Sequence, residues 1–544
     1  MHVAPAPPMR ITRPSVRTIP LALVERVTLA GLILLGFALR LPLLDRFPFR
    51  EDEAIYSVWA LHALREDPHF LRVWPDKPPL FLWLLAGAFE AFGASQAAAR
   101  LPNIFLSVLT IPLVAVVARR LWGRRAALAA AVAMALNPFA ISFAPTAFTD
   151  PLLVFAGVCA LWSAGNRRGL WAGFWLGVAI MTKQQGLFYA PLIVAALFAQ
   201  TIAPSSAGRV AQPARFGVGL LLVTAPIVYW DSLRWQVAPS PWDLGVRNYG
   251  ALALLPPDAW MGRLQSWAGL AWHLTASWPL WLALLAGVGA SLFKLVAPGG
   301  SPAEHHSPRS PITHAHALLL ALWAAAFFAV HVITTVQVWD RYLLPLAPLI
   351  ALGAGWMAAR WLVSYNAPQF GIWLLVAALL LLPPAARAAQ GGLPIGGDHG
   401  DYRGLTEAFA WLQQRTTDGA VLYHRTLGWH AQFYLRHAIE RGDYELRWFP
   451  HAIYLADNAG KVPHRRKWLI QPEWAPVRDL AWRLDARGLA ISEAARFGRF
   501  TVFEITQPAQ PMCDWCVCSS SPPFPPLAPT DKAPMTQSLM GATP

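Results

Sequence analysis

Charged side chains stand where long apolar stretches of this chain end, and their types could support acid–base chemistry. Asp52, with its neighbour Glu53, follows the first apolar stretch, Asp76 precedes another, and Asp150 begins a third. A carboxylate can accept the proton of an attacking hydroxyl group. Because charge beside a membrane is costly unless it is paired or used, we predict that these carboxylates share one site. The alternative is that each is an ordinary solvated loop end.

Cations occupy the same kind of position. Lys77 follows Asp76, Lys183 ends an apolar stretch, and Arg247 and Arg341 lie in two later connectors. An ammonium or guanidinium group can hold a phosphate and stabilise negative charge that develops during a reaction. These four residues are therefore candidate anion-binding groups. For the lysines the alternative is snorkelling, in which the head group only reaches toward water.

The composition is that of a membrane protein. Of the 544 residues, 56% are hydrophobic and 14% are charged, whereas soluble proteins carry about 25% charged residues. A formal charge of +14 would suggest nucleic acid as the partner of a soluble protein. Here the arginines cluster at the ends of apolar runs, which is how membrane topology is encoded, so we exclude nucleic acid. With four cysteines, no disulfide framework is expected.

The apolar runs predict a bundle of about eleven transmembrane helices. A spanning helix needs about 20 mainly apolar residues. Several of the runs are shorter, so their boundaries are defined only to within a few residues. The predicted spans lie near residues 22–44, 102–120, 125–143, 149–165, 169–182, 186–202, 216–231, 278–298, 316–336, 342–360 and 371–386.

Basic residues orient this bundle. Four arginines before residue 27 place the N-terminus in the cytoplasm by the positive-inside rule. The later arginine clusters fall on the same side only if the short run 79–92 lies at the interface instead of crossing. The carboxylates and everything after Ala386 then lie outside the cytoplasmic (inner) membrane of a bacterium.

Composition also divides the chain into parts. In residues 401–506, short helical and strand patterns alternate, which predicts a small soluble α/β domain. It contains neither a nucleophile elbow nor a phosphate-binding glycine loop, so we expect it to have a binding or stabilising role instead of a catalytic one. We expect His424 and His430 to be structural or surface histidines and not metal ligands. The predicted parts are a basic N-terminus (1–21), the membrane module (22–386), the extracytoplasmic domain (387–506) and a disordered tail rich in Pro and Ser (507–544).

The stretch from Arg50 to Tyr56, REDEAIY, resembles the GT-C superfamily of integral-membrane glycosyltransferases. Within it, the chain is similar to the bacterial branch related to protein O-mannosyltransferases and to the lipid A aminoarabinose transferase. The resemblance covers about residues 20–390 and implies a mainly α, GT-C-type bundle whose catalytic face is formed by outer loops. Further matching motifs follow in the family's order: Asp76-Lys77-Pro78-Pro79, Ala99-Arg100-Leu101-Pro102, Thr149-Asp150, Thr182-Lys183 and Arg341-Tyr342-Leu343-Leu344-Pro345.

The resemblance implies a reaction. A sugar, hexose or pentose, would move from a polyprenyl-phosphate donor to an acceptor outside the membrane, with inversion at the anomeric carbon. A donor linked to a lipid cannot leave the bilayer, so its enzyme must work at the membrane surface. Acceptors in this branch include lipids, glycans and proteins, and the sequence identifies neither the sugar nor the acceptor.

The matching positions then receive expected roles. Asp52 is the expected catalytic base, with Glu53 as its rival and Asp150 as a further catalytic candidate. We expect Glu53 to face structural partners, and we expect burial beside other carboxylates to raise the pKa of Asp52. The expected donor-phosphate residues are Lys77, Lys183, Arg247, Arg341 and Tyr342, and the expected substrate-binding residues are Tyr56 and Asp76. The alternative is that residues 51–53 only complement a helix dipole.

A divalent metal ion stays open as a cofactor. Asp52, Asp76 and His273 could supply hard ligands, but their spacing does not compel a site. The tail carries a C-x-x-C-x-C cluster at Cys513, Cys516 and Cys518, where a segment without a fold would offer no supporting shell of hydrogen bonds to a metal.

Two other functions compete with transfer. A transporter or flippase of lipid-linked sugars predicts inverted repeats and polar residues at mid-membrane, and we find neither in the sequence. A non-catalytic membrane scaffold would make the ordered pattern of Asp52, Asp76 and Asp150 accidental. The sequence therefore favours the glycosyltransferase.

Overall fold

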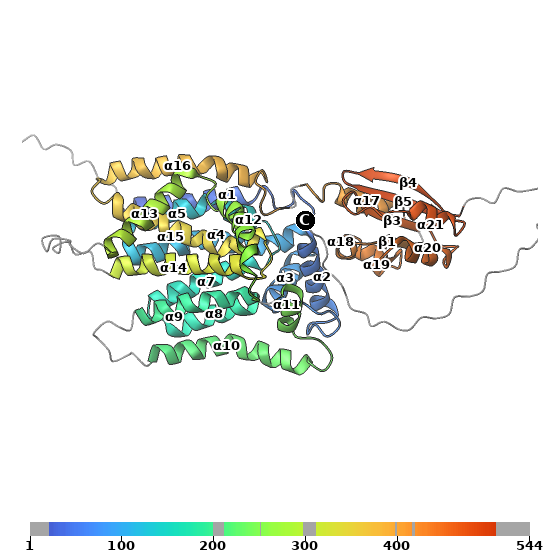
Figure 1. The fold of residues 1–544 in the computed structure, drawn as a ribbon, viewed down its shortest axis with the longest axis horizontal. Helices are drawn as coiled ribbons and strands as arrows, with labels where there is room; N and C mark the ends of the chain where they lie inside the picture. Colours follow the sequence, from blue (N-terminus) through green and yellow to red (C-terminus); the bar gives the residue numbers. More distant parts are fainter. Residues whose placement is uncertain are drawn as a thin grey trace, which may run out of the picture.

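A helical bundle with a small α/β domain at one end makes up the part of the chain that the structure describes (Figure 1). The structure is a computed structural model, and it describes residues 21–199, 211–250, 252–296, 312–397, 400–415 and 419–507. The basic N-terminus before residue 21 and the tail with Cys513, Cys516 and Cys518 lie outside the described residues.

The bundle consists of apolar helices that run side by side (Figure 1). Each predicted span coincides with one helix or with two consecutive helices. These are α1 (Leu21–Arg40), α4 (Gln96–Trp122), α5 (Arg124–Ala135), α6 (Pro138–Phe143), α7 (Asp150–Gly165), α8 (Gly169–Thr182), η1 (Gln184–Phe188), α9 (Tyr189–Ala199), α10 (Ala211–Arg234), α13 (Trp278–Val296), α14 (Ile312–Ile333), η3 (Asp340–Leu346), α15 (Ala347–Trp361) and α16 (Ala367–Ala389).

Several of these helices are suited to a membrane. Among the described residues, five helical stretches are long and apolar enough to cross one: Gln96–Trp122, Ala211–Arg234, Ala315–Ile333, Asp340–Trp361 and Ala367–Ala389. Shorter apolar helices, including α7 and α8, pack beside one another and against these. The chain is therefore a multi-pass membrane protein. The number of eleven crossings stays a prediction.

One predicted span, 125–143, is two helices. Asn137 caps α6, and its side-chain oxygen accepts the N–H of Ala140 at 2.8 Å. Pro138 occupies the first position of α6, where its missing N–H costs nothing, whereas it would break a continuous helix. The Asn137 amide also donates to the carbonyl of Leu274 at 2.8 Å, so the break is tied to the segment before α13.

Glycines allow α8 and α10 to approach closely. A Cβ on Gly173 of α8 would lie 1.9 Å from the carbonyl oxygen of Phe216, and one on Gly219 of α10 would lie 1.9 Å from that of Leu170. In lipid there is little hydrophobic drive between helices, so close backbone packing takes its place. This contact holds α8 against α10, and Lys183 follows the last residue of α8.

Four shorter helices lie toward one end of the bundle: α2 (Glu51–Arg65), α3 (Leu80–Phe92), α11 (Pro241–Tyr249) and α12 (Pro257–Trp272). In Figure 1, α2 and α11 run across the direction of the bundle helices. The run 79–92 corresponds to α3, which has 13 residues and packs against α2 and α4. Helices α11 and α12 fall in the stretch 231–277, which the sequence predicted to be a loop because charged residues interrupt its apolar pattern.

The α/β domain beside the bundle, described over residues 400–415 and 419–507, is named the outer domain after its predicted location. It contains a five-stranded sheet in the order β2-β1-β3-β5-β4. Strand β1 pairs in parallel with β2 and β3, and β5 pairs antiparallel with β3 and β4. The elements are α17 (Leu405–Gln414), β1 (Ala420–His424), α18 (Gly428–Tyr434), α19 (Arg436–Glu440), β2 (Tyr444–Trp448), α20 (Ala452–Gly460), β3 (Lys467–Pro472), α21 (Leu480–Asp485), β4 (Ala490–Phe497) and β5 (Phe500–Thr506).

Each face of this sheet carries its own apolar core. Leu422 of β1 belongs to the core beneath α17 and α18, whereas Val421 and Tyr423 belong to the core beneath α20 and α21. This follows from the alternation of side chains along a strand. The sequence did not predict α19, α20 or β4. Strand β4 is largely exposed, so it lacks a strong apolar pattern.

The outer domain docks on the end of the bundle that carries α2 (Figure 1). The N–H of Phe49 donates to the Tyr434 hydroxyl at 2.9 Å, and Nε2 of His430 lies 3.0 Å from the Phe49 carbonyl oxygen. The Tyr434 hydroxyl in turn donates to Gln96 at 2.5 Å. The domain therefore holds the chain three residues before Asp52.

Candidate active site

The candidate active site lies at the bundle end beside the outer domain. Each of its charged residues stands at or beside the end of a helix, where apolar packing gives way to loops. Asp52 lies in the first turn of α2, and Asp76 and Lys77 lie in the turn before α3. Asp150 is the first residue of α7, Lys183 follows α8, and Arg341 lies in η3. Three carboxylates and three cations thus meet as ion pairs.

Asp52 pairs with Arg341. Nη1 of Arg341 donates to Oδ2 of Asp52, and the Asp52 side chain is 29% exposed while that of Arg341 is 5% exposed. Burial alone would raise the pKa of Asp52, but Arg341, together with Lys77 and Arg50, holds this pKa below its usual value. The expectation of a raised pKa is therefore wrong, because a guanidinium contacts this carboxylate directly.

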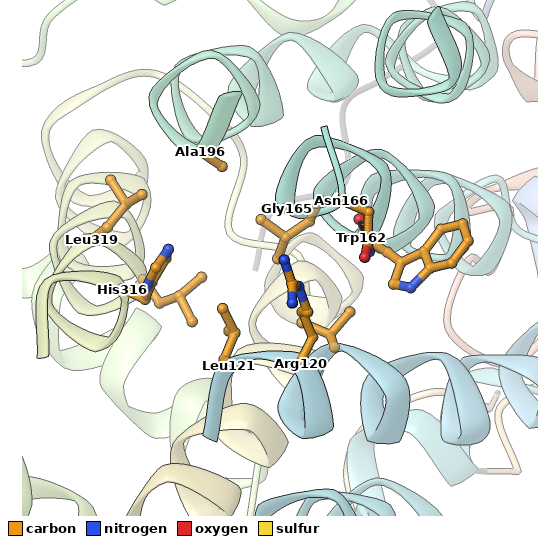
Figure 2. Close-up of a pocket in the computed structure, with 11 residues that line it drawn as sticks. Arg120, Leu121, Trp162, Gly165, Asn166, Ala196, His316 and Leu319 are labelled. Atoms are coloured by element: carbon orange, nitrogen blue, oxygen red, sulfur yellow. Dashed lines mark hydrogen bonds between the residues drawn. The ribbon is translucent and has the colours of Figure 1, made fainter. Parts of the chain in front are cut away.

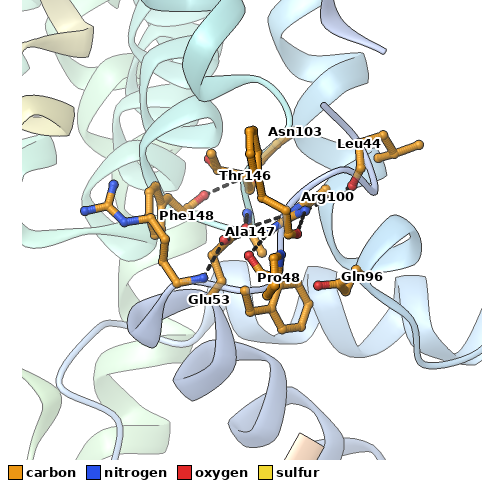
Figure 3. Close-up of polar contacts among 12 residues, drawn as sticks. Leu44, Pro48, Glu53, Gln96, Arg100, Asn103, Thr146, Ala147 and Phe148 are labelled. Carbon is orange, nitrogen blue, oxygen red and sulfur yellow. Dashed lines mark hydrogen bonds and ion pairs between the residues drawn. The ribbon is translucent and has the colours of Figure 1, made fainter. Parts of the chain in front are cut away.

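Glu53 faces the interior of the bundle, as Figure 3 shows. Its two oxygens accept Nε and Nη2 of Arg100 at 2.8 and 2.9 Å. They also accept the N–H groups of Ala147 and Arg50 at 2.9 and 3.0 Å. The Glu53 and Arg100 side chains are almost fully buried. With both oxygens occupied by bidentate and backbone donors, Glu53 joins α2, α4 and the segment before α7.

Asp76 and Lys77 form the second pair. Nζ of Lys77 donates to Oδ2 of Asp76 at 3.0 Å, and it also lies 2.6 Å from the hydroxyl of Tyr249 on α11. That hydroxyl is 2.6 Å from Oδ2 of Asp76, and Asn248 approaches the same oxygen at 3.4 Å. Burial alone would raise the pKa of Asp76, but Lys77 and the Tyr249 hydroxyl hold it below its usual value. Asp76 is therefore a carboxylate in the folded protein.

Asp150 and Lys183 form the third pair. Nζ of Lys183 donates to Oδ1 of Asp150 at 2.6 Å, and both side chains are almost fully buried. Asp150 stands in the first turn of α7, where a negative charge is favoured by the helix dipole. The backbone of Lys183 is extended, which turns its side chain out of α8 toward α7.

Neighbouring residues connect the three pairs. The Gln184 amide, next to Lys183, donates to the carbonyl of Asp76 at 2.8 Å. Nζ of Lys183 also lies 4.2 Å from the ring centre of Tyr342, the residue after Arg341. The three ion pairs are therefore parts of one contiguous site.

Tyr56 lies buried beneath this cluster, one turn after Asp52 on α2. Its ring packs on Trp59 at 5.9 Å and edge-on to Phe81 at 6.4 Å. Burial, with the charge of Asp52, raises the pKa of Tyr56 well above its usual value. Its hydroxyl therefore stays protonated and can donate a hydrogen bond.

Two predicted site residues do not join the cluster. Arg247 of α11 is exposed and takes part in no ion pair among the described residues. His273 follows α12, is half-buried, and lies where Arg387 and Asp340 influence it. Burial, followed by Arg387, lowers the pKa of His273.

The candidate metal ligands Asp52, Asp76 and His273 do not form a ligand group. Within the described ranges, no three His, Cys, Asp or Glu side chains are placed to hold a metal ion together. Asp52 instead forms an ion pair with Arg341, and Asp76 forms one with Lys77. We therefore derive no step through a metal ion.

A hollow of about 440 Å³, including its open mouth, lies at the opposite end of the bundle (Figure 2). Arg120 near the end of α4, Trp162 and Asn166 at the end of α7, and His316 of α14 line it, mostly with apolar neighbours. Since α4 begins beside the outer domain, this hollow is separated from the carboxylates by the length of that helix.

Three residues at the site were given no role from the sequence. Tyr249 and Gln184 touch the Asp76 and Lys77 segment from α11 and η1, and Arg100 anchors Glu53. Arg100 was part of the quoted motif Ala99-Arg100-Leu101-Pro102, so its position carried a signal. Tyr249 carried none, because it lies in the stretch that read as a loop.

Comparison with solved structures defines the class of protein. The fold is similar to that of ArnT from Cupriavidus metallidurans bound to undecaprenyl phosphate, with a TM-score of 0.59 at 19% identity, covering 89% of this chain and 98% of that one. The apo form of the same ArnT gives a TM-score of 0.55 at 20% identity, with the same coverage. The apo oligosaccharyltransferase of Archaeoglobus fulgidus gives 0.50 at 14% identity, covering 82% of this chain and 69% of that chain. The chain is thus a membrane protein with the GT-C fold.

A family model also matches part of the sequence. Residues 76–230 match the family model of dolichyl-phosphate-mannose-protein mannosyltransferases. The matched stretch contains Asp76, Lys77, Asp150 and Lys183. Together with the fold, this confirms the resemblance to the GT-C superfamily that the motifs indicated.

Proposed function

We propose that this protein is a membrane glycosyltransferase that moves a sugar from a polyprenyl-phosphate donor to an extracytoplasmic acceptor, with inversion at the anomeric carbon. The observation that carries the proposal is the meeting of Asp52, Asp76 and Asp150 with Lys77, Lys183 and Arg341 at one end of an apolar bundle. Charges placed beside a membrane indicate a functional site. The ArnT with a similar fold binds undecaprenyl phosphate, which supports a donor of that kind.

In this proposal the donor phosphate lies near Lys77 and Lys183. Both ammonium groups are buried and already held by one carboxylate each, so their positions are fixed before the donor arrives. Preorganised cations stabilise charge that develops on a leaving group without having to move. The polyprenyl chain would stay in the bilayer beside the bundle.

Asp52 is the proposed base. As the bond from the anomeric carbon to the phosphate oxygen breaks, the acceptor oxygen bonds to that carbon from the opposite face. The acceptor proton passes to Asp52, whose Oδ1 carries no hydrogen bond among those of the described residues while Oδ2 is held by Arg341. A carboxylate of low pKa is adequate if the proton moves late, when the acceptor oxygen has become acidic.

Charge is balanced during this step. The phosphate leaves with one more negative charge than it had as a diester, and Asp52 becomes neutral when it takes the proton. Arg341 then loses the charge of its partner and can act on the leaving phosphate. The total charge of the site is the same before and after transfer, which avoids the cost of creating a net charge in a site of low polarity.

The outer domain is proposed to help hold the acceptor. It docks directly on the chain before Asp52, and we assign it no chemistry. The alternatives of a flippase and of a non-catalytic scaffold gain no specific support from the described residues.

The test is donor-dependent transfer by the purified protein. It would be reconstituted in nanodiscs with a panel of radiolabelled polyprenyl-phosphate sugars and with envelope lipids, glycans and proteins as acceptors. The proposal predicts label on an acceptor together with release of polyprenyl phosphate. Movement of intact donor across vesicles without release of polyprenyl phosphate would indicate a flippase. If no donor gives either result, the proposal is rejected.

A further inference from the structure

The connector from α16 to the outer domain passes the candidate site at Gly396. The Gly396 carbonyl accepts Nη1 of Arg50 at 2.6 Å, and its N–H donates to Oδ2 of Asp340 at 2.9 Å. Arg50 lies two residues before Asp52, and Asp340 directly precedes Arg341. One residue of the connector therefore joins the two segments that carry the Asp52–Arg341 pair.

Asp340 links Gly396 to the backbone of Arg341. Its Oδ2 accepts the Gly396 N–H, and its Oδ1 accepts the N–H of Arg341 at 2.8 Å. The Arg341 guanidinium lies over the rings of Phe148 and Trp339, at 5.0 and 5.2 Å from their centres. The rings limit where the guanidinium can go, and Asp340 fixes the backbone from which it extends.

Arg50 approaches from the other side. Its guanidinium lies 5.5 Å from the centre of the same Phe148 ring, while its N–H is held by Glu53 at 3.0 Å. The Gly396 carbonyl thus holds the side chain of Arg50 at the beginning of α2, and Asp52 lies in the first turn of this helix. Both members of the pair are positioned through Gly396.

Only glycine fits at this position. The φ angle of Gly396 is +85°, and a Cβ would lie 2.5 Å from the carbonyl oxygen of Ser142 and 2.8 Å from its Cβ. A side chain would push the connector away from α6 and stretch both hydrogen bonds. At the next residue, Gly397, φ is not positive and a Cβ would meet Phe47 at 3.6 Å, which is an ordinary contact.

We propose that Gly396 is a positioning residue that keeps Arg341 on Asp52 and makes the geometry of this pair depend on how the outer domain is seated. The connector leads into that domain, whose α18 holds Phe49 from the opposite side. The pair is therefore ordered only when the outer domain is docked. The role in transfer rests on the proposed function, while the positioning itself can be tested without it.

The chain offers matched controls for Gly396→Ala. Gly397→Ala alters the neighbouring residue where a Cβ fits. Gly442→Ala introduces the same kind of backbone strain at φ +81°, far from the site and in open space. The variants would be compared at equal amounts of folded protein in nanodiscs, together with Asp340→Asn, which keeps one of the two acceptor oxygens.

Transfer kinetics provide the first measurement. Displacement of a catalytic group by about 1 Å costs about a hundredfold in rate, so G396A should lose about that factor in kcat with little change in the KM of the donor. Asp340→Asn should fall between G396A and wild type. Gly397→Ala and Gly442→Ala should remain close to wild type.

The pH profile separates positioning from general damage. Arg341, Lys77 and Arg50 face Asp52 as cations, and Asp76 lies near as a carboxylate. Burial, with the charge of Asp52, raises the pKa of the neighbouring Glu51 to about 7, so Glu51 titrates in every variant and the comparison between variants isolates Asp52. If Arg341 moves away, the pKa of Asp52 rises, and the acid limb of kcat shifts to higher pH. Loss of folded protein alone would lower the amplitude of the profile without moving it.

Hydrogen exchange tests the positioning without any turnover. In G396A the amides of Arg341 and residue 396 should exchange faster than in G397A and G442A. If exchange at Arg341 and the acid limb are the same in G396A and G397A, the proposal is wrong. If the wild type transfers no sugar but G396A still speeds exchange at Arg341, the proposed function fails and the positioning role stands.

Discussion

Asp52 and Glu53 are neighbours with different partners. Asp52 shares one oxygen with Arg341 and is partly exposed, whereas Glu53 is buried with Arg100 and two backbone N–H groups on its oxygens. A group whose acceptor positions are filled cannot take a proton from a substrate without breaking those bonds. The contacts therefore favour Asp52 as the base and give Glu53 a structural role.

The structural role of Glu53 predicts a loss of stability. Glu53→Gln removes the charge opposite Arg100 and leaves a buried guanidinium without its counter-ion, which costs about 3–5 kcal/mol. A thermal unfolding midpoint measured in detergent should fall clearly below that of wild type. Asp52→Asn is the matched comparison, and it should lose less stability because the Asp52 side chain is partly exposed and asparagine keeps an oxygen for Arg341. Equal midpoints for the two variants would contradict the assignment.

Lys77 and Lys183 are predicted to bind the donor phosphate. A hydrogen bond to a charged group contributes about 1.5–3 kcal/mol, so Lys77→Gln or Lys183→Gln should weaken donor binding about tenfold or more. Binding of undecaprenyl phosphate to protein in nanodiscs measures this. Lys461→Gln, on the exposed surface of the outer domain, is the control. Affinities like that of the control would favour the alternative that the lysines only snorkel.

The helices of the bundle were largely predictable, and the helices across its end were not. Apolar runs identify α4 or α10 because burial in lipid demands unbroken hydrophobicity. Helices α11 and α12 lie at the surface, where charged and apolar residues mix, so their sequences read as a loop. Tyr249 was missed for that reason. The sequence also did not predict which carboxylate pairs with which cation. The predicted topology placed Asp52 and Arg341 on the same side of the membrane. Their direct contact, which lowers the pKa of Asp52, depends on Phe148 and Asp340.

The docking of the outer domain is predicted to weaken in acid through His430. Burial lowers the pKa of His430 to about 4, against about 6.5 in an unfolded chain. The neutral ring bonds to the Phe49 carbonyl with Nε2, and Nδ1 has no partner in the described part of the chain, so a second proton is unfavourable. Because the unfolded state binds more protons, stability should be full above about pH 6.5, fall toward pH 4 and level off below it.

Thermal unfolding of the protein between pH 7.5 and 4 measures this dependence. His430→Gln keeps a donor for the Phe49 carbonyl and cannot titrate, so its curve should be flatter. His424, also buried with a pKa lowered to about 4, contributes equally to both proteins. Parallel curves for wild type and His430→Gln would show that His430 is not responsible.

At the scale of the whole molecule, the charged cluster and the outer domain share one end of the bundle, and a hollow lined by Arg120 lies at the other. By the positive-inside rule, the arginine clusters of the short connectors predict that this other end faces the cytoplasm. The prediction is that the cluster and the outer domain face outward, where acceptors of the cell envelope are found.

Added cysteines test this orientation in a background in which Cys513, Cys516 and Cys518 are serine and the remaining cysteine, Cys159, is buried. Exposed positions are Glu66 after α2, Arg124 at the opposite bundle end and Glu407 in the outer domain. A reagent that does not cross membranes should label Glu66→Cys and Glu407→Cys in intact cells, and Arg124→Cys only after permeabilisation. Labelling of Arg124→Cys in intact cells would invert the topology.

The most direct test of Asp52 as the catalytic base is the transfer rate of Asp52→Asn in a single turnover, measured with donor already bound. The substitution keeps the size of the side chain and a hydrogen-bonding oxygen for Arg341 but removes the base. If Asp52 is the base, the rate should fall about a hundredfold or more, within the range for loss of a general base, with donor affinity preserved. A nearly unchanged rate in Asp52→Asn would contradict it, and the base would have to be sought elsewhere in the cluster.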